Sequence, residues 1–133
     1  MASLAAALAV AGTGCADSEP APAPADISGP PQRVARTVDR LERALRTRDF
    51  ARICDELFTP AARRRAGGDA CAARTAADVG GLRRPTIRLL SIRIAGKRAD
   101  AQVRTSAAGR RPVEETIQLE RSGARYRIAA LAR

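Results

Sequence analysis

The sequence contains no histidine and no tryptophan, and its only aromatic residues are Phe50, Phe58 and Tyr126. Without histidine, a nucleophilic cysteine has no imidazole to activate it, and no phosphate loop, nucleophile elbow or paired-carboxylate motif occurs. A zinc site would need two cysteines and two carboxylates, which is a rare ligand set. With so few aromatic rings, a base-stacking surface is poorly supplied. We therefore expect no metal, no cofactor and no nucleic-acid partner, and we favour a non-catalytic role.

Lysine is nearly absent: 24 residues are basic, and only Lys97 is a lysine. The formal net charge is +10, and because residues 1–32 hold three acidic and no basic residues, the remainder carries +13. The arginine and alanine bias is typical of a GC-rich genome, so part of this basicity is compositional. The run Arg63, Arg64 and Arg65 could hold an anionic ligand or lipid headgroup, or form a solvated helix face.

No apolar run approaches the roughly 20 residues needed to span a bilayer. Leu4 to Ala11 resembles the apolar segment of a secretory signal. The small residues before Cys15 resemble a bacterial lipobox, in which the cysteine becomes the lipidated first residue of the mature protein. Gly12 stands where leucine is usual, and no basic residue precedes the run, which suggests a start codon farther upstream. The alternatives are a secretory cut after Ala11 and an alanine-rich disordered start.

Residues 16–31 are rich in proline and alanine and cannot build a core, so they predict an extended tether of roughly 50 Å at most. The predicted organisation is a signal peptide over 1–15, a tether over 16–31 and one domain over 32–133. One lipid anchor plus one disulfide would use all three cysteines. We expect an extracytoplasmic protein anchored to the membrane, or alternatively a secreted one.

Helical periodicity fills the first half of this domain. The pattern Val34, Val38, Leu41 and Leu45 predicts an amphipathic helix of about 15 residues that ends near Arg48. Further helix starts are predicted from N-capping residues at Asp49, at Thr59 (followed by Pro60) and at Asp69. The last of these helices is predicted to end before Gly80 and Gly81.

Cys54 lies on the apolar face of the second of these helices, and Cys71 lies one turn into the last. Because the predicted signal segment places the protein outside the reducing cytoplasm, we favour a structural disulfide between them. Two buried free thiols and a metal pair are the alternatives.

From Pro85 onward the apolar period changes from helical to alternating. Four strands are predicted, starting near Thr86, Ala99, Val113 and Tyr126 and separated by short glycine turns. The alternation slips between Leu89 and Leu90, which indicates a bulge. Tyr126, Ile128 and Ala130 are predicted to share the apolar face of the fourth strand. Helices followed by an antiparallel meander predict an α+β domain in two layers.

This order, together with the segments L-F-T-P-A-A-R (57–63) and G-A-R-Y-R-I-A-A-L (123–131), resembles the nuclear transport factor 2-like superfamily, and within it the actinobacterial lipoproteins. The resemblance implies a cone, in which a strongly curved sheet wraps around the helices and leaves a pocket. Enzymatic members, such as ketosteroid isomerases and polyketide cyclases, place acids, histidine or tyrosine in this pocket. Non-enzymatic members use the cone for binding a ligand or for dimerisation.

Glu115 interrupts the apolar set of the third strand, and Tyr126 lies on the apolar face of the fourth, so the two could be cross-strand neighbours if the register allows. A carboxylate facing a concave apolar surface could accept a proton, and it could equally lie at the rim or pair with an arginine. Three hypotheses follow. The domain binds a small molecule or protein in its cone, it is an isomerase, dehydratase or cyclase using Glu115 and Tyr126, or it is a homodimerising interaction module.

Overall fold

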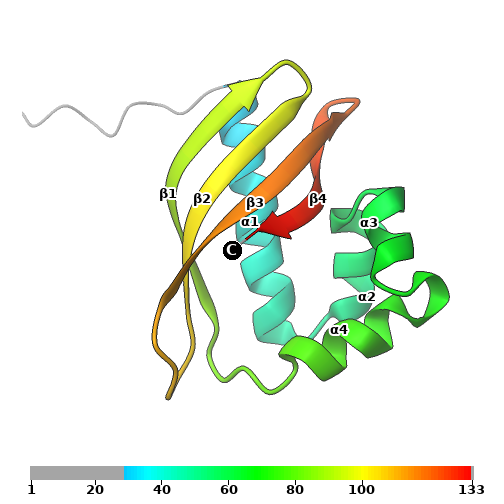
Figure 1. The fold of residues 1–133 in the computed structure, drawn as a ribbon, viewed down its shortest axis with the longest axis vertical. Coiled ribbons are helices and arrows are strands. Elements are labelled where there is room, and N and C mark those ends of the chain that lie inside the picture. Colours follow the sequence, from blue (N-terminus) through cyan, green and yellow to red (C-terminus); the bar gives the residue numbers. More distant parts are fainter. Residues whose placement is uncertain (1–28, 133) are drawn as a thin grey trace, which may run out of the picture.

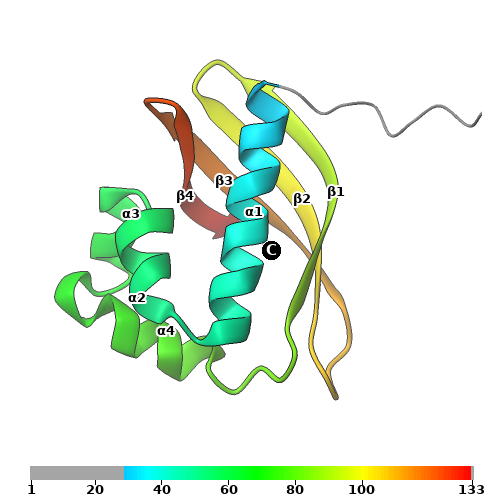
Figure 2. The ribbon, with the colours of Figure 1, turned by 180° about the vertical axis from the view of Figure 1, so that it is seen from behind.

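The computed structural model describes residues 29–132. The helical part comprises α1 (Pro30–Thr47), α2 (Phe50–Arg52), the π-helix η1 (Ile53–Leu57), α3 (Pro60–Arg65), the 3-10 helix η2 (Gly68–Ala70) and α4 (Cys71–Val79). The strands β1 (Thr86–Ala95), β2 (Arg98–Ser106), β3 (Val113–Ser122) and β4 (Arg125–Ala132) form one antiparallel sheet in that order. The predicted α+β fold is therefore confirmed. Figures 1 and 2 show a curved sheet with α1 along one face and the short helices grouped beside β4.

The long helix α1 forms because its apolar residues recur every three or four positions and face the sheet. Val34, Val38 and Leu41 are buried against the inward row of the sheet. Two prolines open the helix, where a missing N–H costs nothing. Arg48 ends it in the left-handed conformation, with φ at 59°. The predicted helix and its C-terminal end are confirmed.

Two of the three predicted helix caps are confirmed. Asp49 accepts a hydrogen bond from the Arg52 backbone N–H at 3.1 Å, and Thr59 accepts one from Ala62 at 3.0 Å. The predicted cap at Asp69 is wrong. A capping residue must precede its helix, whereas the 3-10 turn η2 already includes Asp69, whose side chain lies 3.6 Å from Arg63.

A disulfide joins Cys54 in η1 to Cys71 in α4, as predicted. Both residues are almost completely buried, at 2% and 1% exposure. The Thr75 hydroxyl lies 3.8 Å from the Cys54 sulfur and 3.9 Å from the Cys71 sulfur. A structural disulfide indicates an oxidising, extracytoplasmic environment.

The sheet alternates as the sequence predicts over β2 and β3, with small and branched residues facing the core: Ala99, Ala101, Val103, Ile117 and Leu119 are all buried. The register between β1 and β2 shifts between Leu89 and Ser91, which confirms the predicted bulge. Leu90 is the extra residue, and its side chain is 43% exposed.

A second bulge lies in β4, where Gln118 pairs with Ala130 but Leu119 pairs with Ile128. Ala130 is consequently opposite an outward residue, so its predicted place on the apolar face is wrong. The helical layer explains this second bulge, because it donates hydrogen bonds to two backbone carbonyl oxygens of β4, which is an edge strand. The Ile128 oxygen accepts from the Thr59 N–H at 2.9 Å, and the Ala129 oxygen accepts from the Arg65 guanidinium. These bonds protect an edge that would otherwise be open to pairing.

The predicted signal segment, the lipidation of Cys15 and residues 16–28 of the predicted tether lie outside the described residues, whereas the last two tether positions, Pro30 and Pro31, belong to α1. Within 29–132, the structure has no helix that is both long enough and apolar enough to cross a membrane.

Candidate ligand-binding groove

A groove of about 560 Å³ lies where α1, η1 and the start of β4 meet. Leu57 and Tyr126 contribute to its lining while remaining only 2% and 3% exposed, so they form its floor. The volume is within the roughly 300–1,000 Å³ range of small-molecule sites. The walls are polar, which distinguishes the groove from the mostly apolar lining of such sites.

Five arginines surround the groove: Arg33, Arg36, Arg40, Arg43 and Arg125. The four on α1 are separated by three, four and three positions, so they lie along one flank of the helix over about 15 Å. The fifth is the first residue of β4, which follows the β3–β4 turn. The groove therefore collects guanidinium groups from two elements that are far apart in the sequence.

The groove carries an excess of positive charge, because five arginines face only two carboxylates, Asp39 and Glu56. Glu56 is 3.7 Å from Arg52, which lies outside the groove. Within residues 29–132, no ion pair joins any of the five arginines to a carboxylate.

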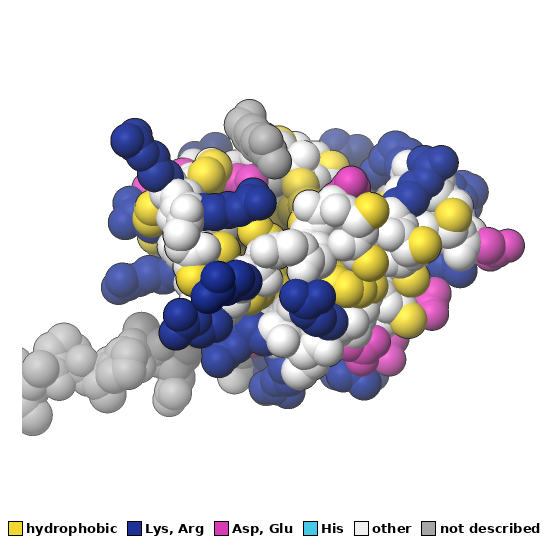
Figure 3. All heavy atoms as spheres, turned by 90° about the horizontal axis from the view of Figure 1, so that it is seen from below, with side chains coloured by type: hydrophobic (Ala, Val, Ile, Leu, Met, Phe, Trp, Pro, Cys, Tyr) yellow, Lys and Arg dark blue, Asp and Glu magenta, His cyan; other side chains and the backbone are white. Residues whose placement is uncertain are grey.

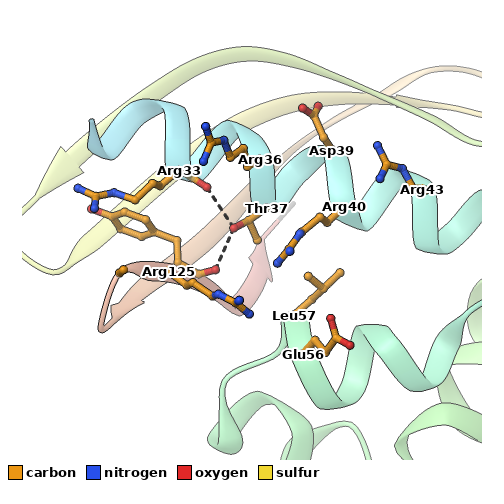
Figure 4. Close-up of a pocket in the computed structure, with 11 residues that line it drawn as sticks. Arg33, Arg36, Thr37, Asp39, Arg40, Arg43, Glu56, Leu57 and Arg125 are labelled. Atoms are coloured by element: carbon orange, nitrogen blue, oxygen red, sulfur yellow. Dashed lines mark hydrogen bonds between the residues drawn. The ribbon is translucent and has the colours of Figure 1, made fainter. Parts of the chain in front are cut away.

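The close-up in Figure 4 shows Arg40 and Arg125 pointing toward one another across the groove, whereas Asp39 points away from them. Thr37 connects the two walls. Its hydroxyl, buried at 6% exposure, donates to the Tyr126 carbonyl oxygen at 2.9 Å and lies 3.2 Å from the Arg33 oxygen. The Arg33 Nε–H is buried and has no acceptor among the described residues. The site is therefore a positively charged groove held between a helix and a strand.

No protein-family model matches the chain, and neither does any curated protein. A solved structure does match: the crystal structure of an NTF-2-like protein of unknown function from Silicibacter pomeroyi. The two share a TM-score of 0.57 and 15% sequence identity, and the match covers 75% of this chain and 90% of that one.

The chain has the nuclear transport factor 2-like fold. Figure 2 shows α1 lying against the curved sheet. At 15% identity the match establishes architecture alone. The predicted resemblance is therefore confirmed for the fold.

Within this nuclear transport factor 2-like fold, the two predicted pocket residues are separated. Tyr126 lines the groove, opposite Arg121 on β3, whereas Glu115 pairs with Val103. Arg121 and Glu115 are six positions apart along β3, or about 20 Å. Glu115 lines a different hollow of about 90 Å³ near the end of β4. The register thus does not make Glu115 and Tyr126 cross-strand neighbours.

The run Arg63, Arg64 and Arg65 lies on α3, outside the groove. Arg63 is 3.2 Å from Asp55 and also contacts Asp69, and Arg65 donates to the Ala129 oxygen on β4. Two of the three guanidinium groups therefore already stabilise the helical layer.

Figure 3 shows the lower face of the molecule, where hydrophobic side chains gather near the middle and Lys and Arg side chains surround them. Many of the acidic side chains visible there lie toward α2–α4. Positive charge is thus spread widely over this face and does not by itself mark a site. The groove between α1 and β4 differs because it is also hollow.

Sequence reasoning did not identify the groove arginines as a site. The α1 arginines were visible only as the polar residues between apolar ones, although their spacing places them on one flank. The approach of Arg125 to α1 depends on how β4 folds back, which the local sequence pattern does not encode.

Proposed function

We propose that this protein is a non-catalytic binding domain that works outside the cytoplasm, tethered to the membrane through a lipid on Cys15. The bound molecule is small and polar and occupies the groove between α1 and β4. The observation that supports this most directly is the groove itself, a hollow of about 560 Å³ with polar walls and a buried floor. Its volume suits a metabolite-sized ligand.

The separation of Glu115 from Tyr126 favours binding over an isomerase or cyclase role. An acid–base pair must reach the same substrate atoms, within about 3 Å of each. Two groups about 20 Å apart along a strand cannot share one small substrate.

Native mass spectrometry of protein extracted from its own membranes tests the binding function. We expect the native species to exceed the denatured mass by one defined small molecule. The sharp comparison is a variant that obstructs the groove from its edge, Ala124→Trp, in the β3–β4 turn, which should purify without this added mass. Equal native and denatured masses for the wild-type monomer would contradict the proposal, and a difference due only to dimerisation would favour the interaction module.

The tether is tested separately by cell fractionation. The wild-type chain should sediment with membranes, and the Cys15→Ser variant should lose the lipid and appear as unprocessed or soluble protein. A wild-type chain found entirely in the culture medium would instead support the secretory cut after Ala11.

A further inference from the structure

Arg40 and Arg125 are the two groove residues whose arrangement points to a bound anion. They come from different walls and point toward one another (Figure 4), and the described residues place no carboxylate in ion-pair contact with either. Like charges that face each other repel, and an anion between them would convert this repulsion into attraction. The nearest carboxylates do not fill this role, since Asp39 points away and Glu56 pairs with Arg52.

We propose that this pair clamps the phosphate group of a phosphate monoester. This inference rests on the proposed binding function and names the class of ligand. A guanidinium presents a planar fork of N–H donors that binds two oxygens of one group. Two forks approaching from opposite walls need acceptors on two sides of one group, which the three terminal oxygens of a tetrahedral phosphate monoester supply. A single carboxylate has two oxygens in one plane and offers fewer acceptor positions to two opposed forks.

The remainder of the groove indicates what else the ligand carries. Arg36 and Arg43 continue along α1 on either side of Arg40, and the Arg33 Nε–H is buried without an acceptor in the described chain. A ligand with hydroxyl or further phosphate oxygens would supply acceptors to these donors. The polar walls do not favour an acyl chain, so a phospholipid would insert its headgroup only. Soluble phosphate monoesters and the headgroup of phosphatidic acid both present this chemistry.

Titration calorimetry with glycerol 3-phosphate tests the clamp, using the full chain purified in detergent and free of phosphate. We expect saturable binding by the wild type. The variants R40A and R125A should each weaken it at least about tenfold, because each removes a charge-assisted contact. The matched control is R110A. It removes the same charge from an exposed residue in the β2–β3 turn, at the opposite end of the sheet, and should bind within about twofold of the wild type.

Two further measurements separate a clamp from general electrostatic attraction. R40K keeps the charge but loses the fork, so it should bind nearly as weakly as R40A. Glycerate, which has a single carboxylate in place of the phosphate, should bind much more weakly than glycerol 3-phosphate. The clamp is overturned if R40K binds like the wild type, if glycerate binds as tightly as the phosphate ester, or if R110A loses as much affinity as R40A. Unchanged thermal unfolding of each variant confirms that it is folded.

Vesicles containing phosphatidic acid distinguish the two sources of phosphate. If the headgroup occupies the groove, vesicle binding is lost in R40A and R125A and is competed by glycerol 3-phosphate. If the ligand is a soluble ester, vesicle binding is unaffected by R40A while calorimetric binding is lost. A co-purified molecule without phosphorus would leave the binding function standing and remove the phosphate assignment. If no molecule co-purifies and glycerol 3-phosphate does not bind, both proposals fail.

Discussion

Removing the Cys54–Cys71 disulfide should destabilise the helical layer more than the sheet. The bond closes a loop across 17 positions, which contains α3 and η2. In the chain-entropy model, a loop of this length contributes about 3 kcal/mol to the free energy of unfolding. For a domain of this size, that loss corresponds to a fall in Tm of about 12–24 °C.

The structure also indicates where the loss will be felt first. Cys71 is the only buried residue of α4, and its apolar neighbours Ala72, Ala76 and Val79 are half-buried, so the disulfide is the main anchor of this helix. The sheet, in contrast, retains its contacts with α1 through Val34, Val38 and Leu41. Reduction should therefore release α4 locally before the whole domain unfolds.

The assay is hydrogen exchange followed by mass spectrometry, together with thermal unfolding, on a Cys15→Ser chain with and without reductant. Amides of residues 71–79 should lose protection on reduction, and those of β2 and β3 should lose much less. A Cys54→Ala/Cys71→Ala double variant should behave like the reduced protein, apart from the added effect of the small cavities it leaves. Two free thiols in the denatured, unreduced chain would refute the pairing, and a change of less than about 1 kcal/mol would refute the loop argument.

The remaining predictions concern hydrogen bonds that join the layers, and each is measured by denaturant unfolding. Arg65→Met removes the donor to the Ala129 oxygen at a largely exposed site, so we expect the free energy of unfolding to fall by about 0.5–1 kcal/mol. Arg64→Met should leave it almost unchanged, and equal losses in the two variants would contradict the role of Arg65. Thr37→Val keeps the shape but leaves the Tyr126 carbonyl oxygen without its donor, so we expect a loss of about 1–2 kcal/mol, and no loss would mean that water replaces the hydroxyl. Glu42→Ala removes the acceptor of the Ile87 N–H, bonded at 2.7 Å, and should cost about 1 kcal/mol, with faster exchange confined to the start of β1.

The elements that could be predicted from sequence are those whose side chains differ strongly in polarity. The helix α1 has valine and leucine at helical spacing between arginines, so its buried face is unambiguous. The bulge in β1 was predictable because two adjacent leucines, Leu89 and Leu90, cannot both face the core of a regular strand.

The sequence-based predictions were wrong where the side chains do not distinguish the buried face of an element from its exposed face. The bulge in β4 lies among alanines, which fit either face, and only Leu131, opposite the buried Ile117, signals the change of phase. The π-helix η1 ends with a backbone bond from the Phe58 N–H to the Ile53 oxygen at 2.9 Å, five positions apart, and the apolar pattern does not specify this spacing. Both features respond to how the helical layer meets β4, which is a tertiary effect.

The hydrogen bond from Thr37 links the stability of the fold to the geometry of the groove. Thr37 precedes Arg40 by one helical turn, and its acceptor Tyr126 directly follows Arg125, so one buried bond fixes the backbone beneath both arms of the proposed clamp. A site whose arms are already positioned loses less conformational entropy when it binds. The surrounding core holds α1 against β4, which fixes the positions of the two backbones that carry these arginines. An anion that enters between their exposed side chains then offsets the repulsion between the two positive charges.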